Sequence, residues 1–305
     1  MNDFRIEVFL SVARNLSFTK ASKELYVSQP AISKHIGELE SSYGVALFER
    51  ANNKIKLTDA GKVFYEYAKD ICQKYRELEF EISLLCNENR GKLSIGASTT
   101  IAQYVLPVII SKYKQKYPQI ELSVISGNTE YVEALVANKD VDLGIVEGAT
   151  HKREFRYSTL LKDELVLIRS CNGQQFNNDA NVFKDEVSIS EFKTLPLVLR
   201  EEGSGTLEVI KKRLKLQNVK IVDLNVIMRL GSSEAIKRYV MAGGSYAIIS
   251  IAAVVDELRR NELTVVDIEG VDLPREFSFI TNSGSQSKIV EDFVVFAGER
   301  YNGKL

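Results

Sequence analysis

The chain has 305 residues, 45% of them hydrophobic and 27% charged, and its 40 Lys and Arg against 41 Asp and Glu leave a net charge of -1. This is the composition of a globular protein long enough for two domains, which excludes fibrous, disordered and disulfide-scaffold proteins. Because the net charge is near zero, any affinity for nucleic acid has to come from a local basic patch. The charged N-terminus lacks the apolar core of a signal peptide, and no apolar run approaches the ~20 residues of a membrane span, so we expect a cytoplasmic protein.

Three short amphipathic helices are predicted first. Apolar residues recur at helical spacing over residues 4–14, and a second helix starts after Ser17, which suits an N-cap. A third helix starts at Ser28, a further N-cap candidate with Pro30 in the first turn, and Gly44 can supply its stop. Because only a short turn separates the second and third helices, they form the outline of a helix-turn-helix.

A small β-hairpin and a long helix are predicted next. Residues 47–50 and 55–57 flank an Asn-Asn turn over 51–54, which is typical of a wing. Thr58 then suits the N-cap of a helix over 59–88, whose apolar residues recur at steps of three and four. The stripe consists of Ala60, Phe64, Tyr67, Ile71, Tyr75, Leu78, Ile82 and Leu85. Such a long helix cannot bury this stripe alone, so we expect a partner helix, most simply its own copy in a dimer.

A polar break at residues 87–91 marks the expected domain boundary. Beyond it strands alternate with helices, which predicts an α/β domain with largely parallel strands and, at over two hundred residues, two lobes. The expected strands are 93–97, 121–125, 143–146, 164–169, 195–199, 246–249, 263–266 and 277–281. The expected helices are 101–116, 130–138, 207–216, 233–242 and 287–298.

The N-terminal motif resembles a known family. Residues 18–40, FTKASKELYVSQPAISKHIGELE, closely resemble the winged helix-turn-helix of LysR-type transcriptional regulators, and LFER at 47–50 and LTDAG at 57–61 resemble its wing and linker. The resemblance covers the whole chain. It implies a winged helix-turn-helix DNA-binding domain over 1–58, an all-α linker and dimerisation helix over 59–90, and a two-lobed α/β effector domain, similar to periplasmic binding proteins, over 91–305. It implies a first lobe at about 91–162 and 268–305 and a second at about 163–267.

The residues expected to contact DNA follow from the geometry of such a motif. The first turns of the recognition helix face base edges or phosphates, and flanking residues reach the backbone. The candidates are Ser28, Gln29, Pro30, Ser33 and Lys34 on that helix, with Thr19, Lys20, Arg50, Lys54 and Lys56 beside it. Residues 1–58 carry eight basic against six acidic side chains, so the patch has to be one-sided, with Glu38 and Glu40 facing away. Charge alone favours a three-helix bundle whose lysines are simply solvated over a DNA-binding domain. The helix-turn-helix motif of residues 18–40 reverses that preference.

The chain departs from the family pattern at two positions. The family often carries another basic residue after the arginine at position 50, where this chain has Ala51, and Gly37 stands where a longer, often basic side chain is common. Both changes remove positive charge, so fewer phosphate contacts than usual are expected.

The three cysteines suit a reducing compartment. Cys72, Cys86 and Cys171 are odd in number and unclustered. Cys72 and Cys86 fall beside the stripe of the long helix, where small packing residues are more common than a redox switch. Cys171 has no nearby partner in the sequence, which disfavours a disulfide sensor.

Three segments of the second domain place small polar residues at a helix start. They are Ser98-Thr99-Thr100, Gly203-Ser204-Gly205-Thr206 and Ser232-Ser233. Each is by itself most simply an N-cap, but together they follow strand ends, where clefts form and where helix N-termini attract anions. The family resemblance implies an effector between the lobes, lined by Ser98, Thr99, Thr100, Asn128, Thr129, Glu147, Arg200, Ser204 and Thr206. It also implies a small anion, such as a carboxylate or a sulfur oxyanion.

Two charged residues of this set have alternative roles. Arg200 suits a bidentate clamp on an anion, and equally an ion pair with Glu201 or Glu202. Glu147 in an anion site has to be paired or turned away, unless it receives an amine or hydroxyl of the ligand.

The leading hypothesis is a DNA-binding regulator that an effector switches allosterically. It acts on promoter DNA as a homodimer, or as the tetramer common in the family. An enzyme is disfavoured, because the two histidines, His35 and His151, lie in no catalytic motif, and no metal or cofactor motif is present. The alternative is a solute-binding protein without DNA activity, which would keep all its function if residues 1–90 were removed.

Overall fold

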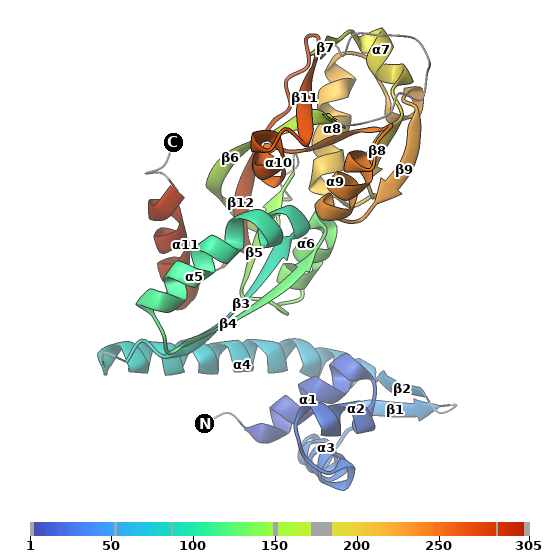
Figure 1. Ribbon diagram of the computed structural model, residues 1–305. Helices are drawn as coiled ribbons and strands as arrows, with labels where there is room; N and C mark the ends of the chain where they lie inside the picture. The colour runs from blue at the N-terminus through green and yellow to red at the C-terminus, as the bar shows by residue number, and fades with distance from the viewer. Residues whose placement is uncertain are drawn as a thin grey trace. The chain divides into compact units, whose positions relative to one another are not determined.

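A computed structural model describes residues 3–51, 54–86, 88–148, 152–171, 185–284 and 286–301. The chain divides into two compact units, Met1–Gly91 and Lys92–Leu305, which are described in turn (Figure 1). Among the described residues, no helix is long and apolar enough to cross a membrane.

The first unit is helical with a two-stranded hairpin. Its elements are α1 (Phe4–Asn15), α2 (Phe18–Glu24), α3 (Gln29–Tyr43), β1 (Phe48–Ala51), β2 (Lys54–Leu57) and α4 (Asp59–Leu85). The predicted N-caps are confirmed: Ser17 accepts from the backbone N–H of Lys20, Ser28 from that of Ala31, and Thr58 from that of Gly61. The predicted wing is confirmed as the antiparallel pair β1–β2, although its two turn residues lie outside the described part.

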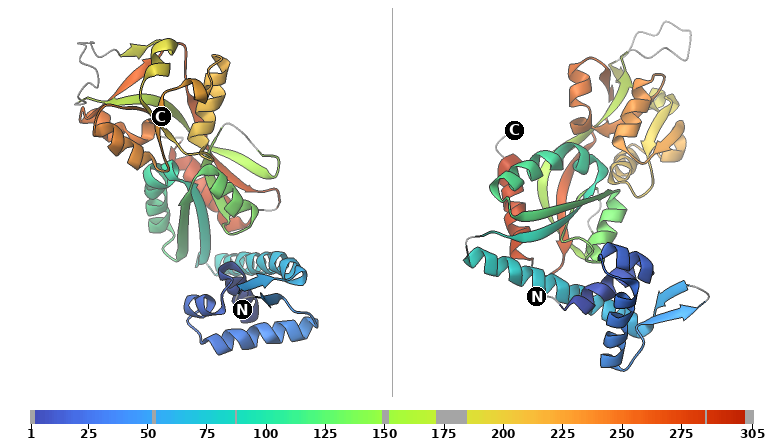
Figure 2. Two further views of the ribbon diagram at one scale, coloured as in Figure 1. Left: turned by 90° about the vertical axis from the view of Figure 1, so that its right-hand side faces the viewer. Right: turned by 60° about the horizontal axis from the view of Figure 1, so that its bottom comes forward.

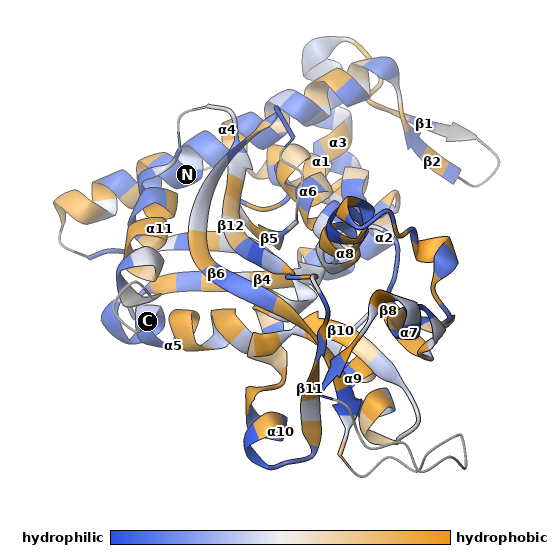
Figure 3. Cartoon of the chain, turned by 90° about the horizontal axis from the view of Figure 1, so that it is seen from above, coloured by the Kyte–Doolittle hydropathy of each residue, from blue (hydrophilic) through white to orange (hydrophobic). Residues whose placement is uncertain are grey.

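One apolar core holds these elements together. Phe9 of α1 contacts Phe48 of β1 and Phe64 of α4, with ring centroids 5.1 and 4.6 Å apart. Such aromatic pairs contribute about 0.5–1.5 kcal/mol each beyond the burial of their area. The long helix ends at Leu85, three residues before the predicted end, where Cys86 donates its N–H to the carbonyl of Ile82. Hydrophobic and hydrophilic residues alternate along α4 in Figure 3.

The second unit is an α/β domain. Its strands are β3 (Gly91–Ser98), β4 (Ile120–Gly127), β5 (Leu143–Glu147), β6 (Phe155–Ser170), β7 (Glu186–Val187), β8 (Leu197–Arg200), β9 (Val226–Leu230), β10 (Tyr246–Ser250), β11 (Leu263–Ile268) and β12 (Pro274–Asn282). Its helices are α5 (Leu106–Lys116), α6 (Thr129–Ala137), α7 (Ile189–Thr194), α8 (Gly205–Leu216), α9 (Ser233–Met241), α10 (Val255–Arg259) and α11 (Lys288–Tyr301). A π-helical turn over Ile101–Val105 leads into α5, and 3-10 turns lie at Ile221–Asp223 and Ile251–Ala253.

The strand order is β4-β3-β5-β12-β6-β10-β8-β9, with β11 beside β6 and β7. The prediction of largely parallel strands is only partly right. The pairs β3–β5, β8–β10 and β8–β9 are parallel, but β12 runs antiparallel to both β5 and β6, and β10 and β11 run antiparallel to β6. The reason is that the long strand β6 runs through both lobes, and no βαβ crossover sets the direction of β6 or of β12.

We call the part with β3, β4, β5 and β12 the first lobe and the part with β7 to β11 the second lobe. The long strand β6 belongs to both, because residues 155–164 pair with β12 and residues 165–169 pair with β10. The sequence did not reveal the first half of β6, the edge strand β9 or the two-residue β7. Their alternation is weak: most residues of β9 are exposed, and β7 is too short to show a period.

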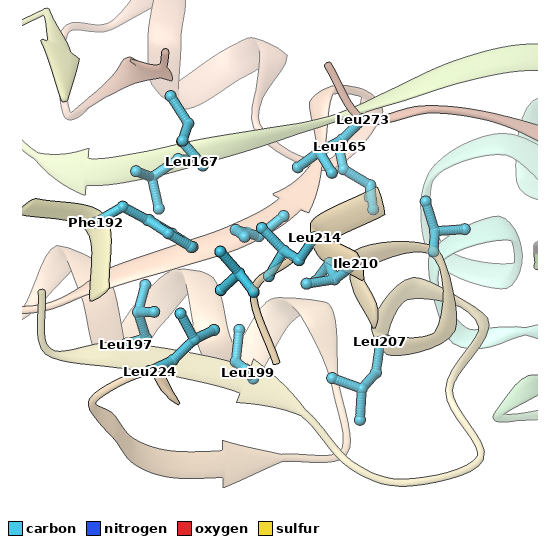
Figure 4. Packing of buried hydrophobic residues seen from close by; sticks show 14 of the residues in the cluster. Leu165, Leu167, Phe192, Leu197, Leu199, Leu207, Ile210, Leu214, Leu224 and Leu273 are labelled. Carbon is cyan, nitrogen blue, oxygen red and sulfur yellow. The ribbon is translucent and has the colours of Figure 1, made fainter. Parts of the chain in front are cut away.

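Each lobe has its own core. In the first lobe, Tyr113 of α5 meets Phe293 and Phe296 of α11 with ring centroids 5.0 and 5.1 Å apart, and Figure 2 shows the two helices side by side. In the second lobe, β6, β8, α7 and α8 enclose an apolar cluster (Figure 4). Its labelled members are Leu165, Leu167, Phe192, Leu197, Leu199, Leu207, Ile210, Leu214, Leu224 and Leu273. A fully buried residue of this kind contributes about 1.5–3 kcal/mol by leaving water, and the cluster therefore fixes α8 on the strands that lead into the candidate site.

Candidate functional site

The candidate DNA-contacting face lies on α3 of the first unit. The helix buries Ile32, Ile36 and Leu39 in the core, so the remaining surface faces outward. On that surface Ser28, Gln29, Pro30 and Lys34 are exposed and Ser33 is half-buried. Gln29 Nε2 donates to Ser33 Oγ at 2.9 Å, and Ser28 Oγ caps the helix by accepting from the N–H of Ala31 at 3.4 Å. The face is thus polar and ordered, with one lysine at its edge.

The other predicted contacts flank this helix in the sequence. Thr19 and Lys20 are exposed in the first turn of α2. Lys54 and Lys56 are exposed at alternate positions of β2, so they lie on one face of the hairpin. The side chain of Arg50 lies outside the described part of the structure.

The two acids expected to face away behave differently. Glu40 Oε1 accepts hydrogen bonds from the backbone N–H groups of Leu47 and Phe48 at 2.8 and 3.2 Å, so this carboxylate holds the start of the wing. Glu38 does not turn from Lys34: Glu38 Oε1 lies 3.9 Å from Lys34 Nζ, one helical turn away. That expectation is therefore wrong for Glu38, because neighbours at i and i+4 share a helix face.

In the second unit the predicted effector residues gather around Glu147, which is 1% exposed at the end of β5. Glu147 accepts hydrogen bonds from three hydroxyls of different segments. Ser98 at the end of β3 donates to Oε2, and Thr100 and Thr206 donate to Oε1 at 3.4 Å each. The structure thus joins both lobes at one carboxylate.

The charge of Glu147 is paired, and the sequence analysis missed its partner. Arg275 of β12 is fully buried, and its Nη1 lies 3.7 Å from Glu147 Oε1 and donates to Thr206 Oγ1 at 2.9 Å. Arg275 Nε also donates to Asp163 Oδ2 of β6 at 2.6 Å, and Ser250 at the end of β10 donates to the same carboxylate at 2.9 Å. An ion pair excluded from water is stable only when hydrogen bonds satisfy its remaining groups. The strand predicted over 277–281 began two residues after Arg275, whereas β12 begins at Pro274 and includes it.

Arg200 takes the ion-pair alternative in this structure. Its side chain is 2% exposed, and Nε and Nη2 donate to Glu201 Oε2 and Oε1 at 2.8 and 2.9 Å, a bidentate pair. Arg200 Nη2 also donates to the carbonyl of Gly231 at 3.3 Å, and Nη1 donates to Ser233 Oγ at 3.4 Å. This pairing lowers the pKa of Glu201 against the opposing effect of its burial. Glu202 instead pairs with Lys211.

Ser233, in the first turn of α9, links Arg200 to the Glu147 cluster. Its Oγ lies 3.1 Å from Thr100 Oγ1, so hydroxyls from the helix starts of both lobes touch. The Ser232-Ser233 segment had been singled out in the sequence, although neither serine was among the residues predicted to line the site. We call Ser98, Thr100, Glu147, Arg200, Thr206, Ser233 and Arg275 the polar cluster.

Thr129 and Asn128 connect the lobes next to this cluster. Thr129 Oγ1 donates to the carbonyl of Glu147 at 2.8 Å and accepts from the N–H of Gly205 at 3.2 Å. A Cβ at Gly205 would lie 1.7 Å from that carbonyl oxygen, so only glycine allows α8 to start here. Asn128 caps α6 by accepting from the N–H of Tyr131, and its Nδ2 lies 3.4 Å from the carbonyl of Glu202. Both side chains therefore hydrogen-bond to the backbone of the second lobe and hold it next to the first lobe. Neither residue belongs to the polar cluster.

Two predicted residues have hydroxyls without a partner. The Oγ1 of Thr99 and the Oγ of Ser204 are buried and make no hydrogen bond to any described residue. Buried polar atoms usually have a partner, so these two hydroxyls retain unused hydrogen-bonding capacity. A third polar atom of this region, Arg275 Nη2, is likewise buried and makes no hydrogen bond to any described residue.

None of the described cysteines forms a disulfide; Cys86 is exposed, and Cys72 and Cys171 are half-buried. Among the residues that the structure describes, no group of three or more His, Cys, Asp or Glu side chains could hold a metal ion.

Comparisons with known proteins match both units. Residues 4–62 match the family model of bacterial regulatory helix-turn-helix proteins of the lysR family, and residues 87–302 match that of the LysR substrate binding domain. A probable RuBisCO transcriptional regulator of Thalassiosira pseudonana is 33% identical over 95% of this chain and 94% of its own. Another relative, the transcriptional activator CmpR of Synechocystis, is 30% identical over 94% of this chain and 91% of its own.

A solved structure supports the same assignment of the second unit. The regulatory domain of CcmR from Synechocystis, in complex with 2-PG, is 27% identical, with a TM-score of 0.61, over 70% of this chain and 98% of that chain.

Proposed function

Because this chain belongs to the LysR family of transcriptional regulators, we propose that it binds double-stranded promoter DNA as a dimer, or as a dimer of dimers. We also propose that a small anion, such as a carboxylate or a sulfur oxyanion, binds at the polar cluster and changes the affinity for DNA. The relatives are transcriptional regulators and not enzymes.

The observation that carries the proposal is the outward face of α3. A helix that buries Ile32, Ile36 and Leu39 and exposes Gln29 and Lys34 from its first turns has the geometry of a recognition helix. Gln29 can hydrogen-bond a base edge, whereas lysines on the wing and on α2 neutralise phosphates. Phosphate contacts make the affinity steeply dependent on salt.

An anionic effector is supported by the donors of the polar cluster. Arg275 already balances Glu147, so the positive charge of Arg200 is the one that an anion would use. An anion that replaces Glu201 on Arg200 would also accept from Ser233 and from Thr99 or Ser204, whose hydroxyls lack partners. Because these donors come from both lobes, the ligand favours the lobe arrangement in which all of them reach it.

A dimer is supported by the stripe on α4. Tyr67, Ile71, Leu78, Ile82 and Leu85 of this stripe are between 40% and 85% exposed in the single chain. A second copy of α4 would cover this surface and set two recognition helices roughly 34 Å, or one DNA turn, apart. A ligand that alters the lobes would then act on DNA through the spacing or angle of the two heads.

The test is fluorescence anisotropy of the full-length protein on DNA from immediately upstream of its own gene, with a scrambled duplex as control. Sequence-dependent binding is expected, and the double variant Lys54→Gln/Lys56→Gln should weaken it on both duplexes and reduce the salt slope by about two. The matched control Lys92→Gln, an exposed lysine paired with Glu121, should change neither quantity. Equal, weak binding to both duplexes that is also insensitive to the wing variant would contradict the proposal and favour a solute-binding protein.

A further inference from the structure

The loop between α3 and the wing is bound on one side by a single residue, Glu40. Its Oε1 accepts from the backbone N–H groups of Leu47 and Phe48 at 2.8 and 3.2 Å, and its backbone carbonyl accepts from the N–H of Val45 at 3.2 Å. Leu47 and Phe48 are 1% and 7% exposed, so water is a poor substitute as acceptor for their N–H groups. Glu40 therefore fixes the path by which the chain leaves α3 and enters β1.

The other side of the same loop is bound by the start of α4. Thr58 Oγ1 donates to the carbonyl of Ala46 at 2.7 Å, and the N–H of Thr58 donates to the carbonyl of Leu47 at 3.0 Å. Gly61 lies so close that a Cβ there would be 2.0 Å from the same carbonyl oxygen of Leu47. We call residues 45–48 the junction, because hydrogen bonds from α3 and from α4 hold them on both sides.

The negative charge of Glu40 is unfavourable for a direct contact with DNA. Residues 1–58 carry only two more basic than acidic side chains, and a carboxylate repels the phosphates of a duplex. Any favourable contribution of Glu40 to DNA binding therefore comes through the groups that it positions. The groups next along the chain are those of the wing, which begins at Phe48 and carries Lys54 and Lys56.

We infer that Glu40 is a positioning residue for DNA binding, which holds the wing so that Lys54 and Lys56 reach the same duplex as α3. This inference rests on the proposed function. A wing released from α3 keeps both lysines, but they have to be ordered at the moment of binding, and this ordering opposes their contacts with phosphates. Fewer phosphate contacts release fewer counterions, so the affinity becomes less dependent on salt.

The test compares Glu40→Asp with Glu40→Gln by fluorescence anisotropy of the full-length protein on the upstream duplex over a series of salt concentrations. Glu40→Asp keeps the charge but shortens the side chain by one methylene, so it should lose the junction and reduce the salt slope by about two, as Lys54→Gln/Lys56→Gln does. Between about 50 and 200 mM salt, this variant should lose about tenfold less affinity than the wild type. Glu40→Gln keeps the length and an acceptor oxygen, so it should keep the wild-type slope.

A double-mutant cycle tests whether Glu40 acts through the wing. Glu40→Asp in the Lys54→Gln/Lys56→Gln background should reduce the slope no further, because residues that act on the same contacts are not additive. A wild-type slope in Glu40→Asp, a reduced slope in Glu40→Gln, or additive effects in the combined variant would each overturn the inference. Glu66→Asp, a matched change of an exposed acid on α4 that pairs with Lys69, should leave the slope unchanged.

Amide hydrogen exchange separates the loss of the junction from unfolding. Exchange at residues 47 and 48 should be faster in Glu40→Asp and unchanged in Glu40→Gln, whereas Ile36 in the core of α3 should stay protected in both. Unchanged exchange at residues 47 and 48 in Glu40→Asp would overturn the inference without any use of DNA. If the wild type binds no duplex, or Lys54→Gln/Lys56→Gln leaves the slope unchanged, the proposed function fails and this inference fails with it. If both of those results are as expected and Glu40→Asp keeps the wild-type slope, this inference alone fails.

Discussion

Replacing Arg275 with Met should destabilise the effector unit strongly, because it would leave two carboxylates in the interior without a cation. The Arg275 side chain is 0% exposed, and those of Glu147 and Asp163 are each 1% exposed, so water cannot solvate the orphaned charges. Removing one partner of a buried ion pair typically costs about 3–5 kcal/mol. Methionine keeps most of the volume, so the loss of charge dominates over any cavity.

The expected change is large enough to measure by calorimetry. For a unit of this size, each kcal/mol shifts the melting temperature by about 2–4 °C, so Arg275→Met should lower it by about 6–20 °C. The matched control is Arg238→Met, since Arg238 pairs with Glu234 but its side chain is 79% exposed. Exposed pairs contribute at most about 1 kcal/mol, so this variant should melt within about 4 °C of the wild type. Equal shifts for the two variants would refute the reasoning that burial makes the Arg275 pairs important.

Three further predictions concern other parts of the chain. Leu78→Glu/Ile82→Glu should raise the dissociation constant of the proposed dimer at least about a hundredfold in sedimentation velocity, because like charges would face each other across the two copies of α4. The control Arg76→Glu, which lies off the stripe, should leave the dissociation constant unchanged. An unchanged dimer in the double variant would exclude this interface. Gly61→Ala should destabilise the first unit by about 1–3 kcal/mol in urea unfolding, since its Cβ would lie 2.0 Å from the carbonyl oxygen of Leu47. Gly37→Ala, with nothing within 4 Å, should be neutral or stabilising, and the opposite order would contradict the packing. Hydrogen bonding by Lys237 lowers the pKa of Glu234 from 4.5 to about 2, so Glu234 stabilises the fold above about pH 4.5, and this contribution is lost as the pH falls toward 2. The difference in urea midpoint between wild type and Glu234→Gln should therefore shrink on acidification, and a constant difference would contradict this assignment.

The first unit was predictable from local patterns. Ser17, Ser28 and Thr58 cap the helices that their positions predicted, because an N-cap depends only on a side chain and a backbone N–H three residues later. The apolar period of α4 likewise anticipated a stripe that the single chain leaves largely exposed. The strands of the effector unit were also largely recognisable, but their directions were not, because hydrophobic runs are the same in parallel and antiparallel pairs.

In the candidate site, the sequence by itself determined which segments carry hydroxyls at helix starts, and Ser98, Thr100 and Thr206 do meet at Glu147. Only the tertiary structure decided how the charges pair. Arg275 lies 112 positions from Asp163 in the chain, and the antiparallel register of β6 and β12 sets the two residues opposite each other. Arg200 could pair with an anion or with its neighbour; in this structure it pairs with Glu201, and Ser233 and Gly231 accept from its remaining donors. Local backbone geometry follows from residues a few positions apart, whereas the partner of a buried charge depends on strand register, which no local pattern encodes.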